Sequence, residues 1–372
     1  MNMKHTNQTL PQVAPIILAL LVAALLSGCA TKPGIIFPVR ADAPRWPAPP
    51  DTRHIEWVGQ LETDQDLKPG LNGFEALGQA VFGKHAARSM LTPFALCTDG
   101  GEDGGRLFVA DSNAQVVHVF NLHTRKYQIW KPGKKDPQFS QPVGIAWDAA
   151  APNGGRLLVS DSVAGAIVVF NNDGKYAGQI GAGVLDRPCG LAIEPGTRRI
   201  AVADAKAHQV VLFEPDGRLA LRIGTRGTKP GEFNFPTGAT FDSAGQLYVC
   251  DALNFRVQIF DRQYKPVRTV GKKGDLPGYF AQPKGIALDP ENHLYILDSQ
   301  FENVQLFDDT GHLLMDFGEE GRGPGQFWLP TGIFIEQVAN SATGLTRIWI
   351  ADSYNRRVQV FNYIPMKPEV QP

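Results

Sequence analysis

Short apolar runs with partial two-residue alternation recur along most of this chain. Within residues 235–271, four such runs are rich in Val, Ile, Tyr and Phe and are separated by Gly, Asp and Asn. This pattern predicts four short antiparallel strands. A four-stranded sheet of this size cannot bury both of its faces, so it needs further sheets of the same kind beside it.

The chain supplies these sheets by repeating itself six times. An aspartate closes the second predicted strand of each copy: Asp111, Asp161, Asp204, Asp251, Asp298 and Asp352. A phenylalanine stands nine residues after each aspartate: Phe120, Phe170, Phe213, Phe260, Phe307 and Phe361. A proline opens each copy: Pro93, Pro142, Pro188, Pro236, Pro283 and Pro330. The prolines are spaced by 49, 46, 48, 47 and 47 residues, and this period predicts an all-β fold, a six-bladed β-propeller of four-stranded blades.

The two ends of the repeat region predict how the ring closes. The segment His54–Gly59 resembles the fourth strand of other copies, whereas the sixth copy has no such strand after Phe361. We therefore expect the N-terminal strand to complete the last blade of a propeller over residues 54–363, which removes exposed sheet edges. Residues 60–92 form an insertion, and the helical spacing of apolar residues within 74–82 predicts a short helix that is either a brace or a lid.

The repeated residues are interpreted as structural. Each aspartate is followed by Ser or Ala, so its carboxylate is expected to accept hydrogen bonds from the backbone of the turn rather than to bind a metal. The six phenylalanines are expected in the core, where burying one contributes roughly 1.5–3 kcal/mol. Arg256 and Arg357 are expected to pair with acids or carbonyl groups at the turns.

The repeat resembles the NHL repeat. Copy four contains Asn-Phe-Arg-Val-Gln-Ile-Phe at Asn254–Phe260, and copy six contains Asn-Arg-Arg-Val-Gln-Val-Phe at Asn355–Phe361. Copy five keeps Pro-Lys-Gly-Ile-Ala-Leu-Asp at Pro283–Asp289, whereas copies one to three lack the Asn-x-Arg pair. The resemblance covers residues 93–363 and implies the propeller fold. It leaves the function open, because NHL propellers host binding modules and enzymes alike.

The first residues resemble a bacterial lipoprotein signal. An apolar run, Val13–Leu26, follows Lys4 and His5 and ends in Leu-Ser-Gly before Cys29. It is short for a membrane span. The resemblance implies a signal peptide over residues 1–28, lipidation of Cys29 and a location in the cell envelope, at the outer membrane facing the periplasm or the exterior. The alternatives are an ordinary secretory signal and an uncleaved anchor.

The segments flanking the propeller are predicted to be extended. Residues 29–53 contain six prolines, which indicates a stalk that holds the propeller away from the lipid surface. Residues 364–372 form a C-terminal tail.

Charge and cysteine content exclude some partners. The net charge is -1 at pH 7, so the chain carries no basic signature, and we expect no nucleic-acid partner. Besides Cys29, the chain contains Cys97, Cys189 and Cys250, an odd number that leaves at least one free thiol in an exported protein. Cys97 and Cys250 fall within predicted strands, whereas Cys189 follows an opening proline and is either structural or reactive.

The strand order predicts where function lies. The opening prolines, the turns between second and third strands and the links between blades gather at one face of the ring, which we call the link face. Its non-repeated residues are the candidates for function. Four aromatic residues on consecutive blades predict an apolar crescent for a protein or peptide partner, unless they pack between blades: Phe255, Phe301, Tyr354 and Phe94. Lys284 and His208 are further candidates for binding the partner.

These features favour a non-catalytic scaffold that binds an envelope protein or peptide. The alternative is a metal-dependent lyase or lactonase with a divergent site. Lactonases of the gluconolactonase/regucalcin type carry an acid after an opening proline, and the peptidyl-hydroxyglycine amidating lyases hold zinc with three histidines. Here the residues after the prolines include no acid: Phe94, Val143, Cys189, Thr237, Lys284 and Thr331. Of the histidines only His208 falls at a turn of the link face, so we predict no catalytic residues, no metal site and no cofactor.

Overall fold

A computed structural model describes most of the repeat region. The described residues are 34–48, 54–68, 86–100, 105–337 and 345–364. The chain divides into two units, residues 1–35 with 68–87 and residues 36–67 with 88–372, and the second unit is described here. Cys29 and the helix expected within 74–82 lie outside the described residues. No helix in the described ranges is both long and apolar enough to cross a lipid bilayer.

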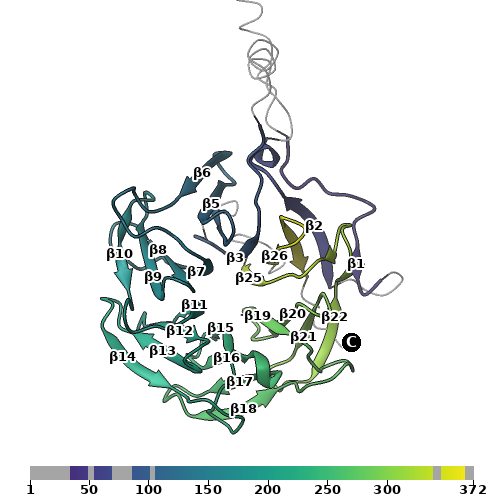
Figure 1. Ribbon diagram of the computed structural model, residues 1–372. Helices are drawn as coiled ribbons and strands as arrows, with labels where there is room; N and C mark the ends of the chain where they lie inside the picture. The colour runs from purple at the N-terminus through teal and green to yellow at the C-terminus, as the bar shows by residue number, and fades with distance from the viewer. Residues whose placement is uncertain (1–33, 49–53, 69–85, 101–104, 338–344, 365–372) are drawn as a thin grey trace, which may run out of the picture. The chain divides into compact units, whose positions relative to one another are not determined.

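Six antiparallel sheets form the blades of the second unit, and Figure 1 shows them around a common centre. A small parallel sheet of β23 (Glu319–Glu320) and β24 (Gln326–Phe327) lies in the link between blades five and six. Blade one consists of β3 (Pro93–Thr98), β4 (Arg106–Asp111), β5 (Val116–Asn121) and β6 (Lys126–Trp130). Blade two consists of β7 (Pro142–Asp148), β8 (Arg156–Asp161), β9 (Ala166–Asn171) and β10 (Tyr176–Ile180). Blade three consists of β11 (Pro188–Ile193), β12 (Ile200–Asp204), β13 (Gln209–Phe213) and β14 (Leu219–Ile223).

The second half of the ring has the same construction. Blade four consists of β15 (Pro236–Phe241), β16 (Leu247–Asp251), β17 (Arg256–Phe260) and β18 (Pro266–Val270), with the 3-10 turn η3 (Ala252–Asn254) before β17. Blade five consists of β19 (Pro283–Leu288), β20 (Leu294–Asp298), β21 (Asn303–Phe307) and β22 (Leu313–Phe317). Blade six contains β25 (Gly332–Gln337), β26 (Thr346–Asp352) and β27 (Arg357–Tyr363). The six-bladed all-β fold is therefore confirmed.

The first strand of each blade lies innermost, and the ring is held together at the seams between blades. β3 contacts β7, β7 contacts β11, and the series continues through β15, β19 and β25 back to β3. Six clusters of buried apolar residues each combine side chains from two neighbouring blades. All six repeated phenylalanines are fully buried in these clusters, as predicted. Each sheet thus covers the faces of its neighbours, which explains why a single copy is not enough.

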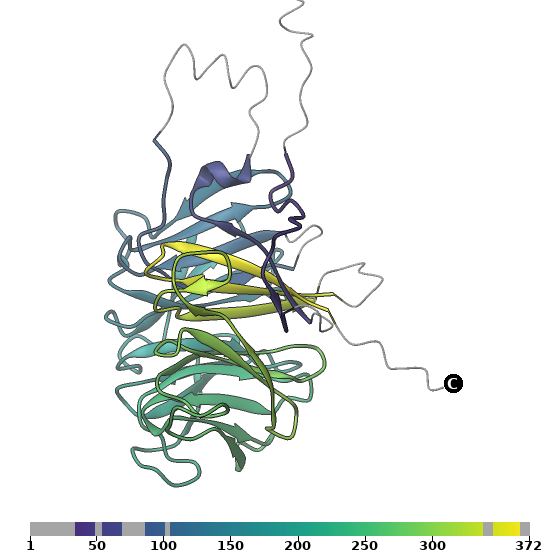
Figure 2. The same cartoon turned by 90° about the vertical axis from the view of Figure 1, so that its right-hand side faces the viewer.

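The N-terminal strand closes the ring, as predicted. β2 (Ile55–Leu61) pairs antiparallel with β27, which places it as the fourth strand of blade six. Figure 2 shows the dark purple N-terminal strands beside the yellow C-terminal strands. A side-chain contact also connects the two strands: Trp57 Nε1 of β2 donates a hydrogen bond to Gln359 Oε1 of β27 at 2.8 Å. Blade six is therefore built from both ends of the repeat region.

The described part of the segment expected to be a stalk differs from that expectation. Arg45–Trp46 forms β1, a fifth strand that pairs with β2 at the outer edge of blade six. The Trp46 ring packs against Phe317 and Phe361 at centroid distances of 5.8 and 5.9 Å. Ala43 and Trp46, and with them Ile36 and Phe37, are partly buried against the core clusters, so part of this segment lies on the propeller. After β2, η1 (Asp64–Leu67) begins the insertion.

Candidate functional site

The repeated aspartates organise the backbone of the link face. All six are fully buried. In blade five, the Asp298 carboxylate accepts hydrogen bonds from the backbone N–H groups of Gln300 and Phe301 in the following turn. It also accepts from the N–H groups of Ala281 and Gln282, at 2.8 and 3.0 Å, in the link that enters the blade. The predicted turn contacts are therefore confirmed there, and the contacts to the link are an addition that the sequence analysis missed.

A second repeated position assists the aspartate. Seven residues after it, Gln258 and Gln359 donate from Nε2 to Asp251 and Asp352. In blade one His118 occupies this position, with its Nε2 3.1 Å from Asp111 Oδ2. The glutamine of the Arg-Val-Gln motif was visible in the sequence, but only the structure shows that His118 replaces it.

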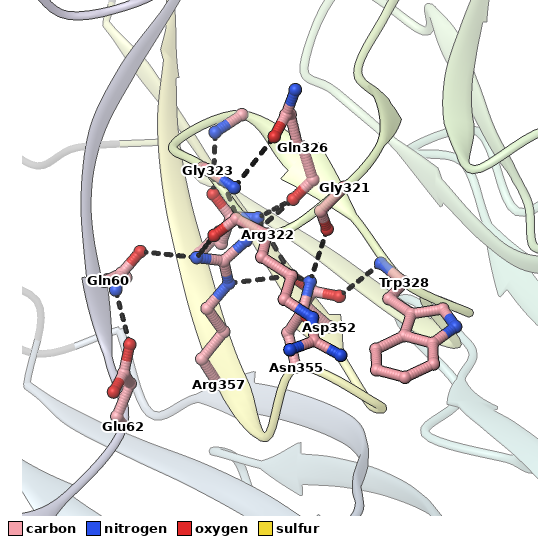
Figure 3. A network of polar contacts seen from close by, with 12 residues as sticks. Gln60, Glu62, Gly321, Arg322, Gly323, Gln326, Trp328, Asp352, Asn355 and Arg357 are labelled. Carbon is pink, nitrogen blue, oxygen red and sulfur yellow. Dashed lines mark hydrogen bonds and ion pairs between the residues drawn. The ribbon is translucent and has the colours of Figure 1, made fainter.

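Arg357 ties the closing blade together, as Figure 3 shows. Its guanidinium donates to Asp352 at 2.8 Å and to the carbonyl oxygens of the link before β25: Arg322, Gly323 and Gln326. It also donates to Gln60 Oε1 of the N-terminal strand at 3.0 Å. Arg256 makes the corresponding contacts to Asp251 and two link carbonyls in blade four. Both arginines thus have the structural role that was predicted.

The innermost strands enclose a central cavity of about 170 Å³ at the axis of the ring. The residues after the opening prolines, which are far apart in the sequence, meet in its lining: Phe94, Val143, Cys189, Thr237, Lys284 and Thr331. Apolar residues of the same strands complete the wall, among them Ile286 and Ile333. Among the positions that the sequence analysis selected, these come together, whereas the turn residues lie further out.

Glycines allow the innermost strands to approach one another. A Cβ atom added at Gly332 would lie 2.5 Å from Phe94 O and 2.9 Å from Ala95 Cα of the neighbouring strand. The Pro-x-Gly motif therefore has a packing reason, because any larger residue would force the inner strands apart.

Lys284 is the cation in the lining of this cavity. It is half-buried, and burial lowers the pKa of its ammonium group, an effect that the charge of Asp298 partly offsets. Within the described ranges, its Nζ forms no hydrogen bond and no ion pair. The Asp298 carboxylate accepts hydrogen bonds from four backbone N–H groups and forms no ion pair with Lys284 in the described ranges.

The other polar groups of the cavity donate to backbone carbonyls. Thr331 Oγ1 donates to Phe94 O at 2.7 Å, and Thr237 Oγ1 donates to Lys284 O at 3.1 Å. Cys189 is a free cysteine, and burial raises the pKa of its thiol to about 11. The thiol is therefore protonated at neutral pH and is a poor nucleophile. Cys97 and Cys250 are buried and free.

The aromatic candidates occupy the link face without touching one another. Tyr354 is 57% exposed and packs on Trp328, with ring centroids 5.5 Å apart. Phe255 packs partly on the core between blades four and five, and Lys273 Nζ lies 5.2 Å from the centroid of its ring. Among the described rings, no contact joins any two of the four predicted crescent residues. The crescent stays a prediction.

His208 links two blades. Its Nδ1 accepts a hydrogen bond from the backbone N–H of Phe235 at 3.2 Å, and the two rings pack edge to face at 5.0 Å. Phe235 stands just before the opening proline of blade four. The histidine thus holds the link of the next blade, and its Nε2 forms no hydrogen bond to any residue that the structure describes.

One group of metal-type side chains occurs in the described part of the chain. Asp289, Glu291 and His293 bring their ligand atoms within 4.8 Å of one another at the β19–β20 hairpin, on the face opposite the link face. The Asp289 carboxylate already accepts from the backbone N–H groups of Glu291 and His293, and from the His293 ring at 2.8 Å. Asp308 makes the same backbone contacts in the next hairpin, which indicates a recurrent turn.

Comparisons with known proteins agree with this geometry. The NHL repeat family matches residues 233–260. A comparison with curated proteins yields no match. Several solved structures are similar in fold. Virginiamycin B lyase from Staphylococcus aureus is 14% identical, with 74% of this chain and 96% of that chain covered and a TM-score of 0.51.

Two further solved structures resemble this chain. An auxiliary nutrient binding protein from Bacteroides thetaiotaomicron is 13% identical, with 74% of this chain and 70% of that chain covered and a TM-score of 0.57. Hydrazine synthase from Kuenenia stuttgartiensis is 14% identical, with 78% and 99% covered and a TM-score of 0.51. At these identities the likeness concerns the fold alone. The repeat match and the six blades together show that this chain is a six-bladed β-propeller with an NHL repeat at residues 233–260.

Proposed function

We propose that this propeller is a non-catalytic scaffold of the cell envelope, which binds a protein or peptide partner on its link face. The observation that carries the proposal is the distribution of exposed apolar side chains. Apart from the N-terminal segment and the outermost strands, the large apolar residues that are exposed in the described ranges all lie on the link face: Leu91, Val163, Leu253, Leu276 and Tyr354. The described hairpin turns of the opposite face expose none. Exposed apolar side chains concentrated on one face favour a binding surface.

Aromatic side chains and cations add to this surface. Tyr354 packs on Trp328 with its ring tilted by 53°, and the Arg322 guanidinium carbon lies 4.7 Å from the centroid of the Trp328 ring. Aromatic residues and arginine are the residue types enriched at protein interfaces. A ring that packs on its neighbour is also restricted before binding, so less side-chain entropy is lost on association.

The acidic groups of the link face favour a binding role over catalysis. The six aspartates that a metal could have used are buried in hydrogen bonds to the links and turns. The group around Asp289 lies on the opposite face and serves its own hairpin. The described residues therefore provide no specific support for the alternative lyase or lactonase.

The proposed location in the envelope rests on the resemblance of the first residues to a lipoprotein signal. A signal over residues 1–28 and lipidation at Cys29 would tether the chain, and stable anchoring requires more than one acyl chain. A tethered propeller would present its link face to partners in the same compartment.

Photo-crosslinking tests the proposal. The photoreactive residue p-benzoylphenylalanine replaces Tyr354 in the full chain, and matched controls carry it at Leu219 or Leu314, which are exposed apolar positions on outermost strands. In envelope preparations we expect a discrete adduct with an envelope protein or peptide from the Tyr354 position and none from the controls. The same adducts from all three positions, or no adduct at all, would contradict a binding face. A triple variant in which Phe255, Phe301 and Tyr354 become Ala is then expected to lose the partner while it keeps the fold.

A further inference from the structure

The central cavity contains a cationic side chain that has no ion pair or hydrogen bond among the described residues. Of the six residues that follow the opening prolines, Lys284 is the only one that carries a charge at neutral pH, because the Cys189 thiol stays protonated. No acidic residue contributes to the lining. An ammonium group that is withdrawn from water without a partner is unfavourable, and an anion placed beside it would remove that penalty.

The neighbouring hydroxyl groups of the cavity are not available to donate hydrogen bonds to a bound anion. The single hydroxyl hydrogen of each threonine is used within the protein, by Lys284 O for Thr237 and by Phe94 O or Ser353 Oγ for Thr331. These two hydroxyls therefore offer no hydrogen to a ligand. Among the side chains of the described lining, Lys284 Nζ, with three N–H groups, is the donor that remains available.

The size and the walls of the cavity restrict the anion. A volume of about 170 Å³ is smaller than the roughly 300–1,000 Å³ of ordinary ligand pockets, so the cavity accommodates a small molecule or the end of a chain. Phe94, Val143 and Ile286 suit a short apolar stem. A phosphate group carries more charge and more acceptor oxygens than one lysine can satisfy, whereas a carboxylate matches a single ammonium group.

We propose that the central cavity binds a carboxylate, supplied by a small organic acid or by the C-terminus of a peptide, with Lys284 as its ion partner. This inference specifies the end group that the scaffold recognises and rests on the proposed function. The apolar stem of the ligand contacts Phe94 and Val143, and the exposed apolar residues of the link face contact whatever extends beyond the cavity.

Ligand-observed saturation-transfer NMR on the full chain in detergent micelles tests the carboxylate site. The probes are propionate and N-acetyl-glycyl-alanine, each compared with its own amide. The variants are Lys284→Met, which keeps the stem without the charge, and Lys284→Arg, which keeps a charge. Lys206→Met is the matched control, because Lys206 lies on the same face but is exposed and already paired with Asp186 at 2.8 Å.

We expect at least one acid to bind the wild type about tenfold to a hundredfold more tightly than its amide. Lys284→Met should reduce that affinity to the level of the amide, Lys284→Arg should restore part of it, and Lys206→Met should leave it unchanged. Binding of propionate alone assigns the site to small acids, and binding of the peptide acid assigns it to C-termini. Equal binding of acid and amide, no binding of either acid, or equal losses in Lys284→Met and Lys206→Met would overturn the proposal. Thermal unfolding of each variant shows that it is folded.

Crosslinking at Tyr354 reports on the proposed function separately. If crosslinking at Tyr354 gives adducts but the NMR experiment shows no preference for the acids over their amides, the carboxylate site is refuted and the scaffold function is kept. Carboxylate binding without adducts would instead remove the macromolecular partner.

Discussion

Replacing Arg357 tests whether the closing blade depends on one buried side chain. Arg357 and Asp352 are 4% and 0% exposed, and the guanidinium donates to five oxygen atoms from three separate segments. In the variant Arg357→Ala, Asp352 keeps its bonds from Trp328 N and Gln359 Nε2 but loses its ion partner. Three link carbonyls also lose a donor.

The structure suggests the size of the effect. Removing one partner of a buried ion pair costs about 3–5 kcal/mol, so this is the loss expected for Arg357→Ala. The free energy of unfolding of a whole domain is about 5–15 kcal/mol. Arg256→Ala is the matched control in blade four, because Arg256 holds Asp251 in the same way but is 14% exposed and donates to two link carbonyls. We expect a loss of about 2–3 kcal/mol for Arg256→Ala, since fewer charge-assisted bonds are broken.

Urea unfolding, followed by tryptophan fluorescence and circular dichroism, measures these losses. Trp46, Trp57 and Trp349 lie in or beside blade six, so fluorescence reports its opening. A double variant with Gln60→Ala should lose less than the sum of the single variants, because Gln60 and Arg357 contact each other. A loss below about 1 kcal/mol for Arg357→Ala, or additivity with Gln60→Ala, would refute the reasoning.

Three further predictions follow from the axis and the hairpins. Burial lowers the pKa of Lys284, so Lys284→Met should raise the free energy of unfolding at pH 7. This gain should vanish as the pH rises toward the unfolded pKa near 10.4, because Lys284 of the folded wild type loses its proton before that of the unfolded chain. Urea unfolding at rising pH measures the change. Gly332→Ala should cost about 1–3 kcal/mol in the same assay, because its Cβ would clash with Phe94 O; a variant as stable as the wild type would contradict the close packing. Millimolar calcium or zinc should not raise the melting temperature, since the Asp289 carboxylate is occupied by its hairpin; a rise that His293→Gln abolishes would reveal a metal site.

The features predicted from the sequence are those that every blade repeats. Six copies of one aspartate and one phenylalanine determine the strand boundaries and the core, because each blade must solve the same packing problem. The ring closure was predictable for a related reason: a missing fourth strand at one end matched a spare strand at the other. Repetition therefore identified the residues that build the ring.

The features that sequence reasoning missed depend on single contacts. No pattern in the proline-rich segment predicted that Trp46 would pack against Phe317 and Phe361. The position of Lys284 was noted, but its lack of a partner depends on which side chains the other blades bring to the axis. The role of His118 was hidden because the residue differs from the glutamine found at that position in blades four to six.

The pairing of β2 with β27 has a consequence for how the chain folds. The contact between Trp57 and Gln359 joins residues 302 positions apart. Contacts of such long range close large loops and slow folding. Five blades can form as their strands become available, but the sixth must wait for the last strand to meet the first. Until then the incomplete ring has two open flanks and an unpaired β2, which makes the interval before closure the period of greatest exposure to aggregation.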